Sequence, residues 1–377
     1  MKLAFCLFKY FPYGGLQRDF MRIADACFAR GHDIHIYTMH WEGETNPAFH
    51  LHLLDVKGWS NHVRSRAFAH KVKAELDKEQ YDLVIGFNKM PHLDVYYAAD
   101  VCYQARVREQ RSKLYRWFPR YKQLVALEAD VFKQGQQTEI MLISSLQQPV
   151  FIHHYHTEKE RFHLLPPGIA KDRIAPPNAP AIRRKLRDTL NIPQDDFILL
   201  MVGSGFKTKG LDRAILGLAS LPQALKAKCH FLIVGQDNPD RFKKLAKTLQ
   251  VEQYIQFLGG RPDVPDFLLA ADLLLHPAYH ENTGTVLLEA LVAGLSVLTV
   301  DICGYAHYIL EADVGRVLSS PFSQSDFNAE LKSMLLSPER EQWKQNGLTF
   351  AQTADIYSMS EKAADLIESV GRRRAIS

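Results

Sequence analysis

The sequence predicts an α/β protein with two domains, each built on a doubly wound, mostly parallel sheet. Three observations lead to this class. The length of 377 residues fits two domains of about 150 residues each. Short apolar runs such as 3–8 and 197–202 are typical of strands that are buried on both faces. Helical patterns separate these runs, as they do where strands and helices alternate along a chain.

The order of predicted elements divides the chain into two halves. Strands are predicted at 3–8, 35–38, 81–88 and 95–100, and then at 197–202, 231–234 and 297–300; further short apolar runs lie at 141–144, 163–169, 255–258 and 272–277. The rigid turn at 166–168, Pro-Pro-Gly, marks the boundary. We therefore expect a first domain over 1–169, a second over 170–355, and a last helical segment over 356–377.

Composition excludes several classes of protein. The chain is 46% hydrophobic and 23% charged, with a net charge of +4, which fits a soluble globular enzyme rather than a generally basic nucleic-acid binder. The five cysteines share no C-x-x-C spacing, and free thiols in a reducing compartment are expected. No apolar run approaches the ~18 residues of a membrane span, and no signal peptide is recognised.

One stretch pairs two carboxylates with the start of a helix. Glu281 and Glu289 flank a small polar run, 282–285, and an apolar helical pattern runs from Val286 to Gly294. A helix N-terminus holds phosphate through unpaired N–H groups and its dipole. Because carboxylates repel phosphate, we expect them to bind hydroxyls, Glu281 those of a sugar and Glu289 those of a ribose. Alternatively, Glu281 only stabilises the helix dipole and Glu289 is solvated.

Two glycine-containing loops follow predicted first strands. Gly14-Gly15 lies between the strand at 3–8 and a helix over 16–30, and 203–210 combines three glycines with two lysines before a helix that starts near Leu211. Glycine permits close approach of the backbone to a ligand. The second loop lacks the order of a Walker A motif.

Together these motifs resemble the retaining, nucleotide-sugar-dependent glycosyltransferases of family 4, which have the GT-B fold. The resemblance rests on Glu-x7-Glu followed by an apolar helix and Gly294, on Gly14-Gly15, on Lys209-Gly210, and on Gly-Arg-x-Asp-Val at 260–264. It implies two Rossmann-like domains that face a central cleft. It also implies a donor site on the second domain and a C-terminal helix that crosses back to the first.

The resemblance assigns site residues. Those implied in catalysis are Glu281, Asp100 and Lys209, and those implied in donor binding are Gly14, Gly15, Asp19, Arg173, Lys209, Arg261, Asn282, Thr283, Gly284, Thr285 and Glu289. The loop 203–210 corresponds to the loop that binds the donor diphosphate in this family. Many relatives have an arginine early in that loop, where this chain has Ser204 and Lys207. Arg173 is therefore expected to supply the second cation. The alternatives are a cap or turn for Asp100, a linker cation for Arg173, and a surface turn for Arg261.

Three further segments, 9–20, 86–91 and 303–308, narrow the resemblance to lipopolysaccharide core glucosyltransferases of Gram-negative bacteria. These transfer glucose from UDP-glucose to the second heptose of the inner core, in an α-1,3 linkage. A covalent and a front-face route both remain open. No Asp-x-Asp motif or metal-ligand spacing is found, so no metal or other cofactor is expected. Asn282-Thr283 departs from the enteric pattern and leaves a UDP-N-acetylhexosamine as an alternative donor; an epimerase of the same fold is a second alternative.

The segment 103–122 is strongly basic. Its cations are Arg106, Arg108, Arg111, Lys113, Arg116, Arg120 and Lys122, and aromatic residues including Trp117 lie between them. With one acid, Glu109, the net charge is +6. Basic and aromatic side chains together suit an anionic lipid surface. Since the implied acceptor is a membrane glycolipid, we expect peripheral binding to anionic lipids on the cytoplasmic face of the inner membrane, and no nucleic-acid partner. The alternative is a solvated helix whose aromatic residues pack on the first domain.

Overall fold

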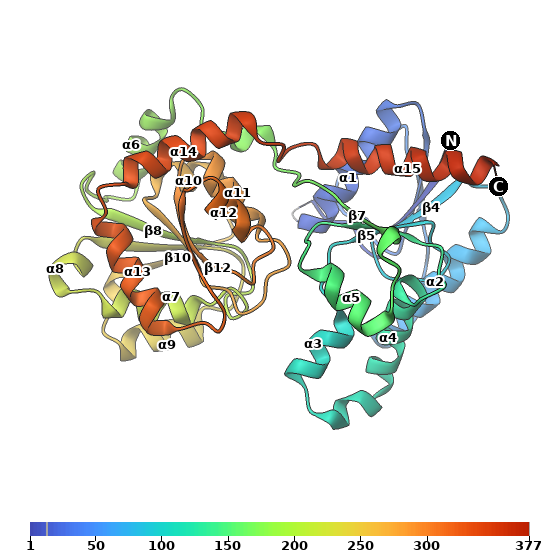
Figure 1. Ribbon diagram of the computed structural model, residues 1–377, viewed down its shortest axis with the longest axis horizontal. Helices are drawn as coiled ribbons and strands as arrows, with labels where there is room; N and C mark the ends of the chain where they lie inside the picture. Colours follow the sequence, from blue (N-terminus) through green and yellow to red (C-terminus); the bar gives the residue numbers. More distant parts are fainter. Residues whose placement is uncertain (13, 377) are drawn as a thin grey trace. The chain divides into compact units, whose positions relative to one another are not determined.

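The computed structural model describes residues 1–12 and 14–376. The chain forms two compact units, Met1–Gly168 with Ser358–Ser377, and Ile169–Tyr357. Each unit is one parallel sheet covered by helices on both faces (Figure 1). The predicted fold class, two parallel α/β domains, is therefore confirmed.

The first unit contains a seven-stranded sheet of order β3-β2-β1-β4-β5-β6-β7. Its strands are β1 (Lys2–Cys6), β2 (Asp33–Thr38), β3 (His50–Leu53), β4 (Leu83–Gly86), β5 (Val95–Ala98), β6 (Glu139–Leu142) and β7 (Phe162–Leu164). Alternate residues of β1 pack into different cores, Leu3 and Phe5 on one face and Ala4 and Cys6 on the other. An uninterrupted apolar run is what a strand buried on both faces requires.

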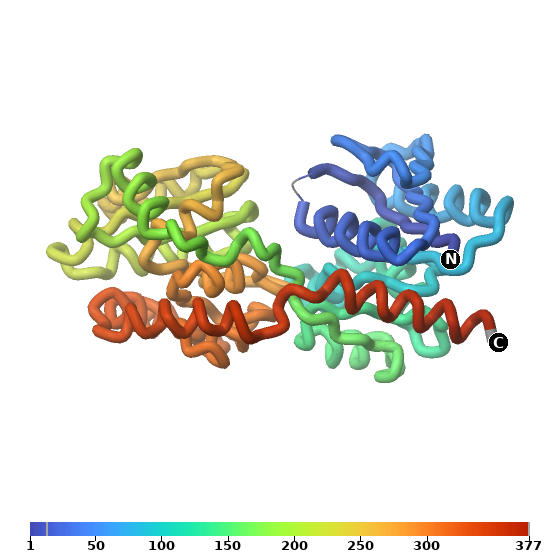
Figure 2. The backbone as a smooth tube through the Cα atoms, turned by 90° about the horizontal axis from the view of Figure 1, so that it is seen from above, coloured from blue at the N-terminus to red at the C-terminus, as the bar shows by residue number. Residues whose placement is uncertain are grey.

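Helices cover the two faces of this sheet. They are α1 (Gly15–Ala29), α2 (Asn61–Leu76), α3 (Tyr103–Gln110), α4 (Pro119–Phe132), α5 (Gln147–Tyr155) and α15 (Met359–Ile376), with short turns η1 (Lys113–Trp117) and η2 (Lys159–Arg161). Helix α15 lies beside α1 (Figure 2). Ala363 and Ile367 enter the core that α1 covers, and Arg30 of α1 pairs with Glu361 at 2.7 Å and Asp365 at 2.8 Å. The end of the chain is thus part of the first unit.

The second unit contains a six-stranded sheet of order β10-β9-β8-β11-β12-β13. Its strands are β8 (Phe197–Val202), β9 (Cys229–Val234), β10 (Ile255–Gly259), β11 (Leu273–His276), β12 (Ser296–Val300) and β13 (Gly315–Leu318). Its helices are α6 (Ala179–Thr189), α7 (Leu211–Ser220), α8 (Gln223–Lys226), α9 (Asp240–Thr248), α10 (Val264–Ala270), α11 (Thr285–Val292), α12 (Ala306–Glu311), α13 (Gln324–Leu336) and α14 (Arg340–Thr353), with turns η3 (Lys171–Arg173) and η4 (Glu252–Tyr254).

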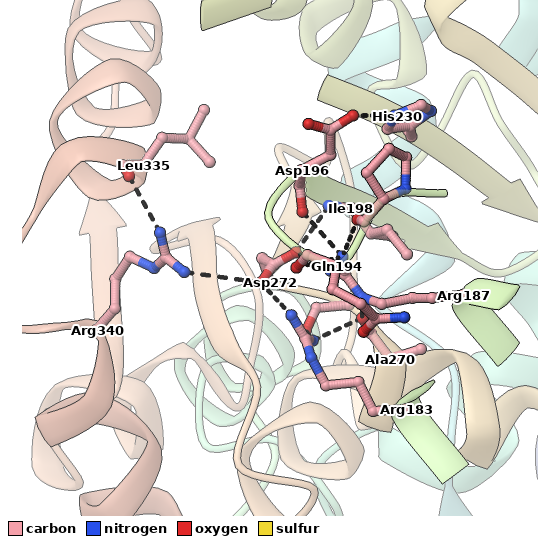
Figure 3. A network of polar contacts seen from close by, with 12 residues as sticks. Arg183, Arg187, Gln194, Asp196, Ile198, His230, Ala270, Asp272, Leu335 and Arg340 are labelled. Atoms are coloured by element: carbon pink, nitrogen blue, oxygen red, sulfur yellow. Dashed lines mark hydrogen bonds and ion pairs between the residues drawn. The ribbon is translucent and has the colours of Figure 1, made fainter. Parts of the chain in front are cut away.

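An ion cluster lies at the amino end of this second sheet (Figure 3). Asp272, just before β11, accepts hydrogen bonds from Arg183 at 2.7 Å, from Arg187 at 2.5 Å and from the Ile198 N–H at 2.8 Å. Arg187 is fully buried. Its Nη1 donates hydrogen bonds to the backbone carbonyls of residues 193, 194 and 196. Burial lowers the pKa of Arg187, and the charge of Asp272 opposes that shift. The cluster joins α6 to the starts of β8 and β11.

Candidate active site

The strand order locates the place where each sheet binds a ligand. Both sheets begin with the order 3-2-1-4 in chain sequence, so the order reverses between β1 and β4 and between β8 and β11. In open α/β sheets, ligands bind at the carboxyl ends of the strands at this reversal. In the second unit the two loops concerned run from Gly203 to Gly210, after β8, and from Pro277 to Gly284, after β11.

These two loops bring Lys209 and Glu281 together. The Lys209 Nζ donates to Glu281 Oε2 at 2.6 Å, and Nε2 of His276, the last residue of β11, is 3.2 Å from the same oxygen. The side chains of Lys209 and Glu281 are 19% and 17% exposed, and His276 is fully buried. The sequence predicted Lys209 and Glu281 but gave His276 no role.

The environment keeps Glu281 ionised. Burial by itself would raise the pKa of Glu281, but the hydrogen bond from His276 and the charge of Lys209 lower it to about 2. Burial lowers the pKa of His276, against the influence of Glu281. His276 is therefore a neutral imidazole that donates its Nε2–H to an acceptor carboxylate. A buried carboxylate with free lone pairs is suited to accept hydrogen bonds from hydroxyl groups.

Two glycines permit the close approach of the loops. Gly203 and Gly210 have φ of +125° and +75°. A Cβ on Gly210 would lie 2.0 Å from the Pro277 carbonyl oxygen, and a Cβ on Gly203 would lie 2.6 Å from Cε of Lys209. Any side chain at 210 would push the two loops apart, and one at 203 would displace the Lys209 side chain.

Arg213 of α7 holds the loop after β11 in place, a role that the sequence analysis did not predict. Its guanidinium donates to the carbonyls of Pro277 at 3.1 Å and Ala278 at 2.9 Å. It also lies between the rings of Tyr279 and Phe322, 3.6 and 3.8 Å from their centroids. The Tyr279 N–H donates to the Thr208 carbonyl at 2.7 Å. The Lys209–Glu281 pair is thus held by both backbone and side-chain contacts.

The polar run 282–285 leads into α11. Gly284 is buried with φ of +78° and precedes the first helical residue, Thr285, which is exposed. The carbonyl of Thr283 accepts from the Tyr305 N–H at 2.8 Å, and Asn282 is half-buried. Helix α11 therefore begins four residues after Glu281, and the N–H groups of its first turn suit an anion.

Glu289 and Arg173 meet one turn further along α11. The Arg173 Nε lies 4.0 Å from Glu289 Oε1, and the two side chains are 18% and 13% exposed. The structure thus brings the predicted second cation to the predicted ribose carboxylate. Arg261 has a different partner, because its guanidinium pairs with Asp263 at 2.6 and 2.8 Å on the exposed loop after β10. Asp263 offsets the charge of Arg261.

The remaining predicted residues belong to the first unit. Gly14 precedes α1, and a Cβ there would overlap the Gln17 amide at 1.8 Å. Gly15 is exposed, while Asp19 accepts from Tyr97 Oη at 2.8 Å. Burial raises the pKa of Asp19, and the hydrogen bond from Tyr97 opposes the shift. Asp19 therefore has a structural partner within its own unit.

Asp100 lies on the rim of a cavity after β5. The cavity, of about 230 Å³, is lined by Asn88, Lys89, Asp100, Arg106 and Arg120 among others. Asn88 is fixed by the Phe8 N–H at 2.7 Å. Lys89 pairs at 2.5 Å with Glu128, which is fully buried, so Arg106 and Arg120 provide the positive charge of the rim. The structure thus places Asp100, which the resemblance implied in catalysis, beside two cations of the basic segment.

Glu128 was missed by sequence reasoning. Besides Lys89, its carboxylate accepts from the N–H groups of Tyr103 and Gln104, at 2.8 and 3.0 Å, and from Tyr155 Oη at 2.6 Å. Burial would raise the pKa of Glu128, but Lys89 and the donors lower it. This buried carboxylate holds the N-terminus of α3, where the basic segment begins.

The basic segment forms α3, η1 and the first turn of α4, which project from the body of the first unit (Figure 1). Pro119 is the first residue of α4 and separates it from the preceding turn. Leu114, Trp117 and Phe118 are 73%, 75% and 57% exposed, whereas Tyr121 is buried. Each predicted cation is exposed except Arg116, which is half-buried. In the described part of the chain no helix has the length and apolar character needed to cross a bilayer.

Comparisons with known proteins agree with this geometry. The model of the family "Glycosyl transferases group 1" matches residues 182–350. The lipopolysaccharide glucosyltransferase WaaG of Escherichia coli (strain K12) is 48% identical over 368 residues, which are 97% of this chain and 98% of that protein.

Solved structures agree as well. The crystal structure of WaaG, a glycosyltransferase involved in lipopolysaccharide biosynthesis, superposes with a TM-score of 0.91 at 48% identity and covers 97% of this chain and 99% of that one. Anabaena HepE in complex with UDP-glucose shares the fold alone, with a TM-score of 0.73 at 18% identity over 98% of this chain and 100% of that one. The chain therefore belongs to the group 1 glycosyl transferases, in the same family as WaaG, and it is a glycosyltransferase.

Proposed function

We propose that this enzyme transfers glucose from UDP-glucose to the second heptose of the lipopolysaccharide inner core, in an α-1,3 linkage and with retention. The observation that carries the proposal is the Lys209–Glu281–His276 group at the strand-order reversal of the second unit. The relative that is 48% identical is a lipopolysaccharide glucosyltransferase, which supports the sugar and the acceptor class. The match covers 97% of this chain and 98% of that relative, which supports the same type of reaction for the whole chain.

The chemistry of the group fits a departing nucleoside diphosphate. The N–H groups at the start of α11 offer positive charge for the diphosphate, and Lys209 adds to it when its Nζ shares its hydrogen bonds between Glu281 and a phosphate oxygen. Glu281 is ionised, because its pKa is about 2, and it accepts hydrogen bonds from hydroxyls of the transferred sugar. Glu289 is placed by the same reasoning at the ribose, with Arg173 next to it. These side chains and N–H groups can carry the charge without a metal ion, so we propose a metal-independent transfer.

The acceptor cavity suits a polar, anionic glycan. Asp100 is exposed on its rim, where a carboxylate can accept a hydrogen bond from a sugar hydroxyl, and Arg106 and Arg120 add positive charge. Lys89 does not add to that charge, because Glu128 neutralises it. We assign Asp100 to the acceptor and the two arginines to its anionic groups.

A donor screen tests the proposal. Purified enzyme is incubated with heptosyl-core lipopolysaccharide and one of three donors, UDP-glucose, UDP-galactose or UDP-N-acetylglucosamine. Mass spectrometry then measures the added mass, and NMR gives the anomeric configuration and linkage. A hexose added only from UDP-glucose, α-linked at O3 of the second heptose, is expected. A gain of an N-acetylhexosamine would instead assign the alternative donor that Asn282-Thr283 leaves open.

We also propose that the α3–η1–α4 segment binds anionic lipid on the cytoplasmic face of the inner membrane. The exposed Trp117, Phe118 and Leu114 can enter the interface, and each cation near it contributes about 1 kcal/mol. The exposure of these side chains argues against the alternative in which the segment's aromatic residues are all packed on the first unit. The half-buried Tyr115 and buried Tyr121 pack together, with ring centroids 6.4 Å apart, and hold the segment's shape.

A further inference from the structure

The first unit contains a group of histidines that the reaction does not use. Asp33 and His35 lie on β2, two residues apart, and His50 lies on β3 directly opposite His35 in the strand register. Because side chains alternate along a strand, the three share one face of the sheet. Within residues 1–12 and 14–376, they form a group whose ligand atoms all lie within 4.8 Å of one another.

Two distances in the group match those between ligands of one metal ion. His35 Nε2 lies 3.2 Å from Asp33 Oδ2, and His50 Nε2 lies 3.3 Å from Asp33 Oδ1. Ligand atoms at 2.0–2.1 Å from a tetrahedral zinc ion are separated by about 3.3 Å. Two imidazoles and one carboxylate are also the ligand set of zinc sites that keep an open fourth position.

A second set of contacts orients the buried ligand. His35 Nδ1 lies 3.0 Å from His52 Nε2 and 3.1 Å from Tyr81 Oη. A metal-binding histidine usually donates its other ring N–H to such a partner, which fixes the tautomer and the ring orientation. With the proton of His35 on Nδ1, the lone pair of Nε2 points toward Asp33 and is available to a cation.

The surrounding charges permit a divalent cation. Neutral imidazole is the form that binds metal. The nearby cation, Lys2, is paired with Glu79, so its charge is offset. Asp33 and His50 are 49% and 58% exposed, which leaves an entry path and room for a water ligand.

We infer that Asp33, His35 and His50 form a divalent transition-metal site, of which zinc is the best-fitting ion. The site is remote from the reaction, because Asp33 and His50 are the first residues of their strands and the candidate active site follows the carboxyl ends. With a water molecule as its fourth ligand, the ion would link β3, a four-residue edge strand, to β2. Short edge strands hold few ladder hydrogen bonds and benefit from such a link.

Zinc titration of the full chain, without an affinity tag and after EDTA treatment and dialysis, tests the inference. Calorimetry should give one zinc per chain, and cobalt should give the intense visible absorption of a tetrahedral site. A hundredfold excess of zinc over its Kd should raise the melting temperature of the first unit by roughly 5–10 °C. No zinc uptake, or equal uptake of Mg²⁺, would overturn the site.

Four variants locate the ion. His50→Gln and Asp33→Asn replace exposed ligands and should fold, yet both should abolish the tight zinc site. His52→Gln removes a partner of His35 and should weaken zinc binding by about 10–100-fold. His230→Gln is the control, because His230 pairs with Asp196 at 3.0 Å outside any such group, and it should bind zinc as the unaltered chain does. Unchanged binding in His50→Gln and Asp33→Asn would refute the assignment.

Discussion

Lys209→Met removes one charge from the ion pair at the centre of the proposed donor site. The pKa of Glu281 is about 2, against an ordinary value of 4.5, and a shift of that size corresponds to about 3 kcal/mol. Without Lys209, burial still raises the pKa of Glu281, while only the hydrogen bond from His276 lowers it. We therefore expect the pKa of Glu281 to return toward or above its ordinary value.

The sign of the effect on stability follows from this shift. A carboxylate with a depressed pKa stabilises the folded chain above its unfolded pKa and loses that contribution as the pH falls toward the folded pKa. The difference in free energy of unfolding between the unaltered enzyme and Lys209→Met should thus be largest above about pH 4.5. It should shrink by up to about 3 kcal/mol as the pH approaches 2.

Transfer activity provides the second measurement. Loss of one group that stabilises developing charge typically lowers the rate by ~10²–10³, and Lys209→Met should show this loss at saturating UDP-glucose. Lys207→Met is the control, because it removes the same charge from an exposed position of the same loop. Equal rates for the two variants, or a stability difference that is independent of pH, would refute the proposed role of Lys209.

Four other results are expected. Gly210→Ala should separate the two loops and lower both activity and stability strongly, because its Cβ would lie 2.0 Å from the Pro277 carbonyl oxygen. Gly205→Ala is the control: Gly205 has φ of +80° but no atom nearer than 4.0 Å to an added Cβ, so this variant should lose only the backbone strain of about 1–2 kcal/mol. Equal losses of unfolding free energy in the two variants, measured in urea, would contradict this. Asp272→Ala should destabilise the second unit by about 3–5 kcal/mol, because it leaves the buried Arg187 without its counter-ion, and an unchanged unfolding midpoint would exclude that. Transfer should survive excess EDTA; a strict need for Mg²⁺ or Mn²⁺ would remove the proposed diphosphate site. Acidic substitution of Arg106, Arg111 and Lys113 together should abolish salt-sensitive co-sedimentation with anionic vesicles, and equal binding to neutral vesicles would reject the electrostatic contribution.

Apolar runs singled out in the sequence overlap eleven of the strands, but no run was singled out at β3 or β13. Both are edge strands of four residues. His50-Leu51-His52-Leu53 is half-buried or exposed along its length, so it lacks the continuous apolar run that marks a central strand. Gly315-Arg316-Val317-Leu318 begins with glycine and holds a half-buried arginine. Their identity as strands comes from pairing with β2 and β12, which local sequence does not encode.

In the candidate site too, local motifs predict some residues, whereas contacts between distant segments determine others. Lys209 and Glu281 were predicted because each belongs to a local motif, a glycine-rich loop and a loop before a helix. The partners that tune and position them are distant in sequence: Arg213 contacts carbonyls 64 and 65 residues away. Arg261 illustrates the opposite limit, since its motif was recognised but its charge is taken by Asp263, two residues away.

The sequence contains enough information to predict that His276 lies at the ligand-binding end of its strand. A histidine that ends a run of three leucines, Leu273 to Leu275, is expected at the carboxyl end of a buried strand, where doubly wound sheets bind ligands. What the sequence does not give is the tautomer. The 3.2 Å contact with Glu281 assigns the proton to Nε2, because a carboxylate can only accept, and the burial of His276 favours the neutral ring. The proton on Nε2 in turn explains how Glu281 remains ionised in a buried place while its other lone pairs stay available to a sugar.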